Sequence, residues 1–151
     1  MLLPGMIVLP TFGYDYVDDV MVTVHKAVDP SQEDWSQMLT DLQAKLRHLR
    51  GNLVLAGDIK LTARQRKGVA DAVGGSRLKV AVMTESAITR GILRAIGWLG
   101  GPTGVRPFAM QELAGALDYL EVRGRQRRQV EDVIGKLRAS LSESSDAPDV
   151  S

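Results

Sequence analysis

Two short apolar runs, at residues 53–56 and 78–83, lie in the middle of the chain. Each run ends at small or polar residues and is followed by a stretch with helical spacing. Short continuous runs that contain β-branched residues are typical of strands buried on both faces of a parallel sheet. The hydrophobic pattern therefore predicts an α/β fold with parallel central strands.

Further strands are expected on both sides of this pair. Residues 6–9 and 20–25 are apolar runs that predict two antiparallel strands. The turn residues expected between them are Gly13, Asp15, Asp18 and Asp19. A short strand is also expected at residues 105–110, and Pro107 places it at the border of the sheet because proline cannot donate to a central ladder.

Helices are expected where apolar residues recur at intervals of three and four. Ser31, Thr62 and Ser86 stand at the start of three such stretches and are natural N-caps. Two further helices follow, at residues 111–120 and beyond residue 128. The predicted order is ββαβαβαβα plus a C-terminal helix, with a mostly parallel sheet of four to five strands and right-handed crossovers.

The same pattern predicts four parts along the chain. Residues 1–19 form an N-terminal extension with a strand, and residues 20–122 form the main domain. Residues 123–142 are expected to be a basic hinge followed by an amphipathic helix. Residues 143–151 are rich in Ser, Asp and Glu, a composition typical of disorder.

The composition excludes several classes of chemistry. Lys and Arg number 19 against 18 Asp and Glu, so the chain as a whole does not attract polyanions. Cysteine is absent, which removes disulfides, thiolate nucleophiles and cysteine-ligated metals. His25 and His48 are the only histidines, and their spacing does not pair them as metal ligands. No metal or cofactor is expected.

A cytoplasmic location is expected from the N-terminal sequence. Residues 1–10 are largely apolar but lack the basic start of a signal peptide, and Pro4, Gly5 and Pro10 interrupt the run. No window reaches the roughly 18 apolar residues that a membrane helix needs.

Several segments together carry a likeness to a known family. They are residues 25–35, with Asp29-Pro30-Ser31 and an acidic turn before Trp35, then 61–66, 80–86 running into Arg90, Gly97-Trp98, and 108–120. In this order and over about residues 20–122, the chain resembles the STAS domain, the fold of anti-sigma-factor antagonists. It is most similar to the divergent bacterial branch that is related to the CRAL-TRIO lipid carriers.

The resemblance implies binding rather than catalysis. Such domains bind kinases, anti-sigma factors, transporters or small ligands. In the antagonists, a Ser or Thr that opens the helix after the first central strand is phosphorylated, and Thr62 opens the corresponding helix here. The antagonists carry an Asp-Ser-Ser-Gly-like run at that place, whereas this chain has Lys60-Leu61-Thr62-Ala63, so Thr62 is a candidate switch only.

Two groups of residues are candidates for binding an anion or a partner. Thr62 with Arg64 and Arg66 could hold a phosphoryl group at a helix N-terminus. Ser86, Arg90 and Arg94 form the second group, which should meet the first at one edge of the sheet because ligands bind outside the carboxyl ends of parallel strands. The alternative for both groups is a structural cap beside a solvated helix face.

Two apolar stretches are candidate partner surfaces. Trp98 and Leu99 precede a glycine-rich loop, where they either dock a partner or pack in the core. The C-terminal helix carries a heptad-like seam formed by Val130, Ile134, Leu137 and Leu141. This seam must pack on its own domain, on a second copy in a homodimer, or on a partner. The basic run 123–128 before it is interpreted as a solvated hinge, and nucleic acid is not expected because interleaved aromatic residues are absent.

No catalytic residues are predicted. The chain contains no nucleophile elbow and no phosphate-binding loop with strand–turn–helix context. The sequence therefore predicts a non-catalytic regulatory protein–protein interaction module of the STAS-like type, which acts in cytoplasmic signalling and is switched by phosphorylation or anion binding. The alternative is a carrier or sensor of a small ligand, either a lipid or a nucleotide.

Overall fold

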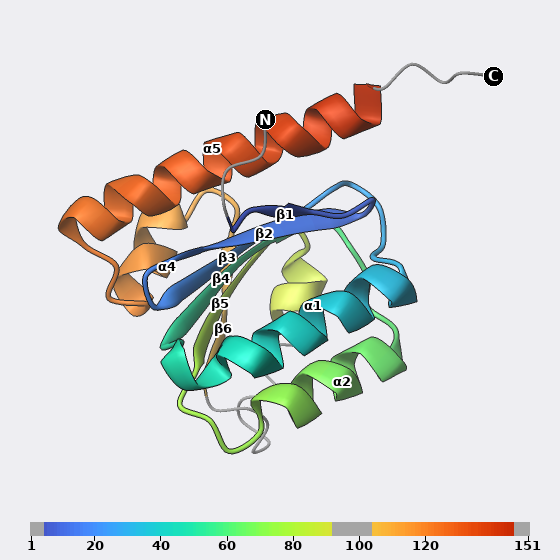
Figure 1. Ribbon diagram of the computed structural model, residues 1–151, viewed down its shortest axis with the longest axis horizontal. Coiled ribbons are helices and arrows are strands. Elements are labelled where there is room, and N and C mark those ends of the chain that lie inside the picture. Colours follow the sequence, from blue (N-terminus) through green and yellow to red (C-terminus); the bar gives the residue numbers. More distant parts are fainter. Residues whose placement is uncertain (1–4, 92–103, 147–151) are drawn as a thin grey trace.

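The computed structural model describes residues 5–91 and 104–146, with side chains to residue 143. A six-stranded sheet lies between two layers of helices (Figure 1). The strands are β1 Ile7–Val8, β2 Phe12–Val17, β3 Val20–His25, β4 Gly51–Gly57, β5 Lys79–Thr84 and β6 Val105–Ala109. The helices are α1 Gln32–Lys45, α2 Ala63–Val73, α4 Leu113–Tyr119 and α5 Gly124–Asp146, with a 3₁₀ turn at Leu46–His48, and residues 87–91 are also helical.

The strands stand in the sheet in chain order, from β1 to β6. The pairs β1–β2 and β2–β3 are antiparallel, whereas β3 to β6 run parallel to one another. The predicted α/β class, the mostly parallel sheet and the C-terminal helix are confirmed. The position of β6 at one border of the sheet also agrees with the interpretation of Pro107.

The predicted strand count was too low because residues 12–17 form β2 rather than a turn. Phe12, Tyr14 and Tyr16 alternate with Gly13 and Asp15 along this strand, which is the period-two pattern of a sheet. The turn is confined to residues 18 and 19, since Val17 pairs directly with Val20. Asp18 has a φ of 52°, the left-handed conformation that a two-residue hairpin requires and that Asp tolerates.

Each face of the sheet has its own apolar core. On β3, Val20, Val22 and Val24 pack with α4 and α5, whereas Met21 packs with α1. The α1 side also contains the buried Trp35, from a helix that Ser31 caps as predicted by accepting a hydrogen bond from Asp34 N at 3.1 Å. The alternation of side chains along β3 therefore covers both of its faces, as expected for a central strand.

The seam of α5 belongs to this core. All four of its residues are buried with at most 4% of the side chain exposed, against β1, β2 and β3. They are Val130, Ile134, Leu137 and Leu141. Of the three arrangements that the sequence left open, packing on the chain's own domain is correct. The prediction that these residues form a partner surface or a homodimer contact was wrong, because their apolar atoms are already covered.

Gly13 lets α5 approach the sheet. A Cβ atom at this position would lie 3.0 Å from the carbonyl oxygen of Ile7 and 3.2 Å from Leu137 Cδ2. Both distances are tighter than most contacts of real Cβ atoms, so a side chain at this position would require its neighbours to shift by a few tenths of an ångström. Gly13, which suggested a turn in the sequence, therefore lies inside β2, where the absence of a side chain allows β1 and α5 to pack closely.

The boundaries predicted along the chain also change. β1 and β2 pair in the same sheet as β3, and α5 shares the core of residues 20–122, so these segments form one domain. The basic run at 123–128 is not a hinge, because the chain is helical from Gly124 onward. Residues 143–146, predicted to begin a disordered tail, continue α5, and residues 147–151 lie outside the described chain.

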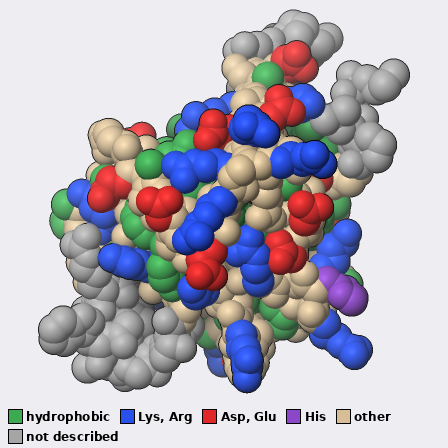
Figure 2. All heavy atoms as spheres, turned by 90° about the vertical axis from the view of Figure 1, so that its left-hand side faces the viewer, with side chains coloured by type: hydrophobic (Ala, Val, Ile, Leu, Met, Phe, Trp, Pro, Cys, Tyr) green, Lys and Arg blue, Asp and Glu red, His purple; other side chains and the backbone are tan. Residues whose placement is uncertain are grey.

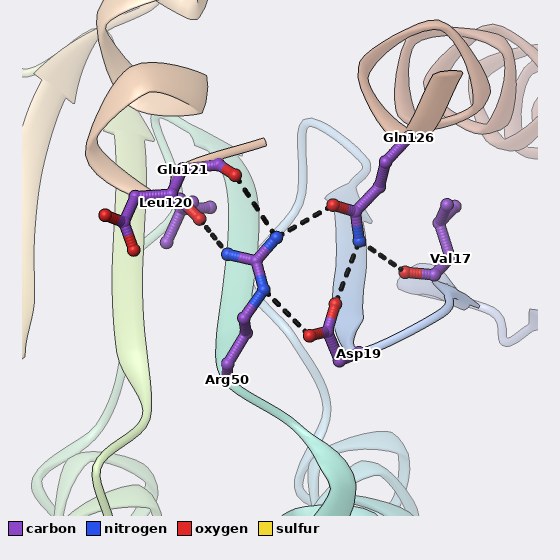
Figure 3. Close-up of polar contacts among 6 residues, drawn as sticks. All are labelled: Val17, Asp19, Arg50, Leu120, Glu121 and Gln126. Atoms are coloured by element: carbon purple, nitrogen blue, oxygen red, sulfur yellow. Dashed lines mark hydrogen bonds and ion pairs between the residues drawn. The ribbon is translucent and has the colours of Figure 1, made fainter. Parts of the chain in front are cut away.

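Arg50 ties four segments together at the amino ends of the parallel strands (Figure 3). Its Nε lies 2.8 Å from Asp19 Oδ2, and its Nη2 donates to Gln126 Oε1 at 2.8 Å. The guanidinium also donates to the carbonyl oxygens of Leu120 and Glu121. The β2–β3 hairpin, the start of β4, the end of α4 and the start of α5 thus meet at one side chain.

The Gln126 amide completes this network. Its Nε2 donates to Asp19 Oδ1 at 2.9 Å and to the Val17 carbonyl at 3.2 Å. Partial burial raises the pKa of Asp19, but hydrogen bonding from Gln126 and the charge of Arg50 outweigh it, so the pKa lies below its usual value. Asp19 therefore keeps its negative charge opposite the guanidinium.

We predict that Arg50→Met lowers the free energy of unfolding by about 2 kcal/mol, because it leaves carbonyls and a carboxylate without their charged donor. Arg47→Met is the matched control, since Arg47 is exposed and has no hydrogen bond or ion pair among the described residues. Urea denaturation of both variants measures the difference. Equal midpoints for the two variants would contradict a structural role for the Arg50 network.

Candidate interaction edge at the carboxyl ends of the strands

Three loops meet where the parallel strands β3, β4 and β5 end. We call residues 26–31, 57–66 and 84–91 the carboxyl edge. The backbone N–H of Lys60 donates to Asp29 Oδ1 at 2.8 Å, which joins the first segment to the second. The N–H of Glu85 donates to the Gly57 carbonyl at 2.9 Å, which joins the second to the third. The three segments therefore form one continuous surface.

Thr62 caps α2, as predicted. Its Oγ1 accepts a hydrogen bond from Gln65 N at 3.0 Å, and Gln65 Oε1 accepts one from Thr62 N at 2.9 Å. The reciprocal pair satisfies two N–H groups that a helix start otherwise leaves open. Gln65 is buried, and its Nε2 donates to the Pro30 carbonyl at 2.9 Å, so the cap is fixed to the loop before α1.

The side chains around Thr62 face water. Thr62, Arg64 and Arg66 are all exposed. The Arg66 guanidinium donates to the Leu61 carbonyl at 2.7 Å, which holds it beside the helix start. The hydroxyl of Thr62 is thus at the surface, with two arginines on the same turn of helix.

Ser86 and Arg90 close the end of β5. Ser86 Oγ accepts a hydrogen bond from Thr89 N at 3.1 Å and caps the helix that follows, as predicted. Arg90 Nη1 donates to the Thr84 carbonyl at 2.9 Å, and Thr84 Oγ1 donates to the Gly57 carbonyl at 2.8 Å. Thr62 and Ser86 therefore lie at the same edge, as the strand order predicted. Arg94, Trp98 and Leu99 lie outside the described residues.

Val28 and Ile88 distinguish this edge from the rest of the surface. Val28 is 49% exposed and Ile88 is 77% exposed. They are the exposed large hydrophobic side chains of residues 5–91 and 104–143, and both lie on the carboxyl edge. The hydrophobic pattern of the sequence did not predict a functional role for Val28 or Ile88. The one feature of the sequence that could have indicated an exposed apolar side chain here is Val28 itself, which stands between Ala27 and Asp29.

A cleft of about 350 Å³ opens beside this edge, between the strand ends and the last turns of α5. Its apolar lining comes from Val24, Leu55, Ala56, Met110 and Leu141. Its polar lining includes His25, Lys26, Asp58, Glu85 and Arg138. The volume is at the lower end of the range for small-molecule sites.

No group of three or more metal-binding side chains occurs among the residues that the structure describes.

His25 lies at the end of β3 among aromatic rings. Its ring centroid is 4.8 Å from that of Phe12 and 6.2 Å from that of Trp35. Its Nδ1 is buried and has no hydrogen-bond partner within the described chain. Burial lowers the pKa of His25 to about 4, because the charged imidazolium would lose its hydration.

Comparisons with known proteins found no matching family model, no similar curated protein and no similar solved structure. Within residues 5–91 and 104–146, no helix has both the length and the apolar character needed to cross a bilayer. The functional interpretation therefore depends on the geometry of this edge and on the order of the elements.

We predict that His25 makes the protein less stable in acid. Its pKa is 6.5 unfolded and about 4 folded, so the unfolded state binds the extra proton between these values. The contribution of neutral His25 is complete above pH 6.5 and is lost as the pH falls to 4, a change of about 3 kcal/mol. Urea denaturation as a function of pH measures it.

The control compares the two histidines. His25→Phe should flatten the stability profile between pH 6.5 and 4, whereas His48→Phe should retain it because His48 is exposed. An unchanged slope in the His25→Phe variant would contradict the assignment.

Proposed function

We propose that the chain is a non-catalytic regulatory module of the STAS-like type, which binds a protein partner through the carboxyl edge. The exposure of Val28 and Ile88 on this edge carries the proposal. Apolar side chains surrounded by polar residues are typical of protein contact sites. Removing both from water would contribute to binding in proportion to the apolar area covered.

The polar residues of the edge fit the rim of such a contact. Six charged residues of both signs lie on the same edge as the two apolar side chains, and all six are exposed to water. They are Asp29, Asp58, Glu85, Lys60, Arg64 and Arg66. Charges at a rim contribute more to partner choice and association rate than to affinity.

The hydroxyl groups of this edge support binding rather than catalysis. Four of them, on Ser31, Thr62, Thr84 and Ser86, are engaged with backbone N–H or carbonyl groups. A nucleophilic hydroxyl needs a base within hydrogen-bond reach, and in the described chain none of the four bonds to a histidine. The strand–helix order from β3 to α4 is also the order on which the likeness to STAS domains rests.

The cleft beside the carboxyl edge supports a second candidate function, the binding of a small ligand. Its apolar lining would accept a hydrocarbon group, and Arg138 or Lys26 would face an anionic one. A lipid or a nucleotide carrier would use this cleft instead of the exposed apolar side chains.

We predict that Ile88→Asp reduces partner capture about tenfold or more, because it places a charge at the contact. Immobilised wild-type and variant chains are incubated with native cell extract, and bound proteins are quantified by mass spectrometry. Ala139→Asp is the matched control, since it adds the same charge at an exposed position on α5. Proteins held equally by both variants would contradict the proposal. A small molecule that co-purifies in native mass spectrometry, with no protein captured, would favour the carrier.

We predict that Thr62→Glu weakens binding of the captured partner about threefold or more. A negative charge here would pair with Arg64 and Arg66 and withdraw them from the partner's carboxylates, as a phosphoryl group would. Thr62→Ser keeps the cap and should bind like the wild type. Thr62→Ala should lose about 1 kcal/mol of stability through the cap without losing affinity. Titration calorimetry measures the affinity of the wild type and of the three variants for the partner. Equal affinities for all four proteins would contradict a role of Thr62 as a switch.

A further inference from the structure

The fold separates charges that are nearly balanced along the sequence. We call residues 18–19, 45–50, 74–79, 104–106 and 118–128 the amino edge, because β3 to β6 begin there. Ten of the chain's 19 Lys and Arg residues lie on it, against four of its 18 acidic residues. The cations are Lys45, Arg47, Arg50, Arg77, Lys79, Arg106, Arg123, Arg125, Arg127 and Arg128. The acids are Asp18, Asp19, Asp118 and Glu121.

Six of these ten cations are arginines whose side chains form no hydrogen bond or ion pair with the residues that the structure describes. Arg50 pairs with Asp19, and Arg127 pairs with Asp118 at 3.1 Å, so two of the four acids are already matched. The remaining arginines of this edge are exposed, and the described part of the chain offers them neither a hydrogen bond nor an ion pair. They are Arg47, Arg77, Arg106, Arg123, Arg125 and Arg128, of which Arg106 contacts aromatic rings.

The sheet and the Arg50 network bring these segments together. Lys79 pairs with Gly51 across the sheet, and Val80 pairs with Val105, so the starts of β4, β5 and β6 are neighbours. Lys79 Nζ lies 5.4 Å from the centroid of the Tyr119 ring, and Arg106 Cζ lies 5.5 Å from the same centroid. The start of α5 is held beside them by the bonds from Arg50.

The resulting surface is visible as a face on which Lys and Arg side chains predominate, with acidic side chains between them (Figure 2). A shallow hollow of about 390 Å³ lies at one side of this edge. Arg47 and Arg77 both line the hollow, together with Gly74, Gly75 and Ser76. Leu46 and Leu49 complete the lining, and the two arginines give this recess the charge that a phosphate needs.

We infer that the amino edge binds the phosphate backbone of a nucleic acid. Eight of its ten cations are arginines, whose planar guanidinium matches a phosphate with two parallel hydrogen bonds. Stable anchoring at a membrane is favoured by exposed apolar side chains beside the basic ones, and the buried core of a protein interface is enriched in apolar side chains. In the described chain, the large exposed apolar side chains, Val28 and Ile88, lie on the opposite edge.

This inference replaces the expectation that nucleic acid is not a partner. That expectation was based on the nearly balanced charge of the whole chain and on the run at 123–128, which contributes four of the ten cations. The other six come from segments that are distant in sequence and that only the fold assembles. The inference does not depend on the proposed function, because it concerns the other end of the molecule.

Fluorescence anisotropy with a short labelled single-stranded RNA and a short DNA duplex, both of mixed sequence, tests the inference. We expect binding that weakens about tenfold or more between about 50 and 200 mM salt, because bound phosphates release counterions. The triple variant R123Q/R125Q/R128Q should lose about tenfold or more in affinity. The matched control K60Q/R64Q/R66Q removes the same charge from the carboxyl edge and should bind like the wild type.

Three results would overturn the inference. One is no binding of either probe at the lower salt concentration. Another is an equal loss of affinity in the two triple variants, which would mean that only net charge matters. The third is equally tight binding of polyglutamate or of phosphatidylserine vesicles, which would assign the surface to another polyanion. Ile88→Asp should bind both probes normally, which separates this test from that of the partner surface.

Discussion

The parallel strands of this sheet are apolar on both faces, and α1 and α2 cover one of them. On the other face, α4 covers β5 and β6, and the part formed by β1, β2 and β3 would be exposed to water without the buried seam of α5. Gly13 permits the close approach of helix and sheet, and Arg50 fixes the start of the helix through polar contacts. The C-terminal helix is therefore part of the domain's core, and the remaining structure depends on it.

Covering both faces leaves the two ends of the strands as the places where loops and helix termini gather. The ends differ in chemistry. The carboxyl edge presents Val28 and Ile88 among charges of both signs, whereas the amino edge presents mainly arginine. We therefore propose a protein contact for the first and a phosphate contact for the second. A chain of this kind could hold two different molecules at opposite ends without any contact between the two sites.

Local features could be predicted from the sequence because their causes are local. The two central strands follow from apolar runs, and Ser31, Thr62 and Ser86 cap helices through bonds to residues three positions away. The second strand was missed because Gly13 and Asp15 indicate a turn when they are considered alone. The close approach of the Ile7 carbonyl and of Leu137 to Gly13 explains why a glycine stands there.

Long-range features could not be predicted in this way. The Arg50 network joins residues that are up to 109 positions apart, and no spacing in the sequence indicates it. The gathering of ten cations on one edge is likewise a property of strand order, since the chain's overall charge is only +1. The sequence shows that the seam of α5 is apolar. The surface against which the seam packs could be identified only from the structure, in which β1, β2 and β3 present an apolar face to it.

Native-state hydrogen exchange of the full chain tests most directly whether α5 is part of the core. If it is, the buried seam of α5 is not available to a partner, and binding is confined to the two edges. The account predicts that amides of residues 130–141 exchange as slowly as those of β4, because both open only when the whole domain unfolds. Amides of the carboxyl-edge loop 26–31 should exchange much faster. Exchange of α5 well before β4 would contradict the account, because it would mean that the helix detaches from a sheet that stays folded.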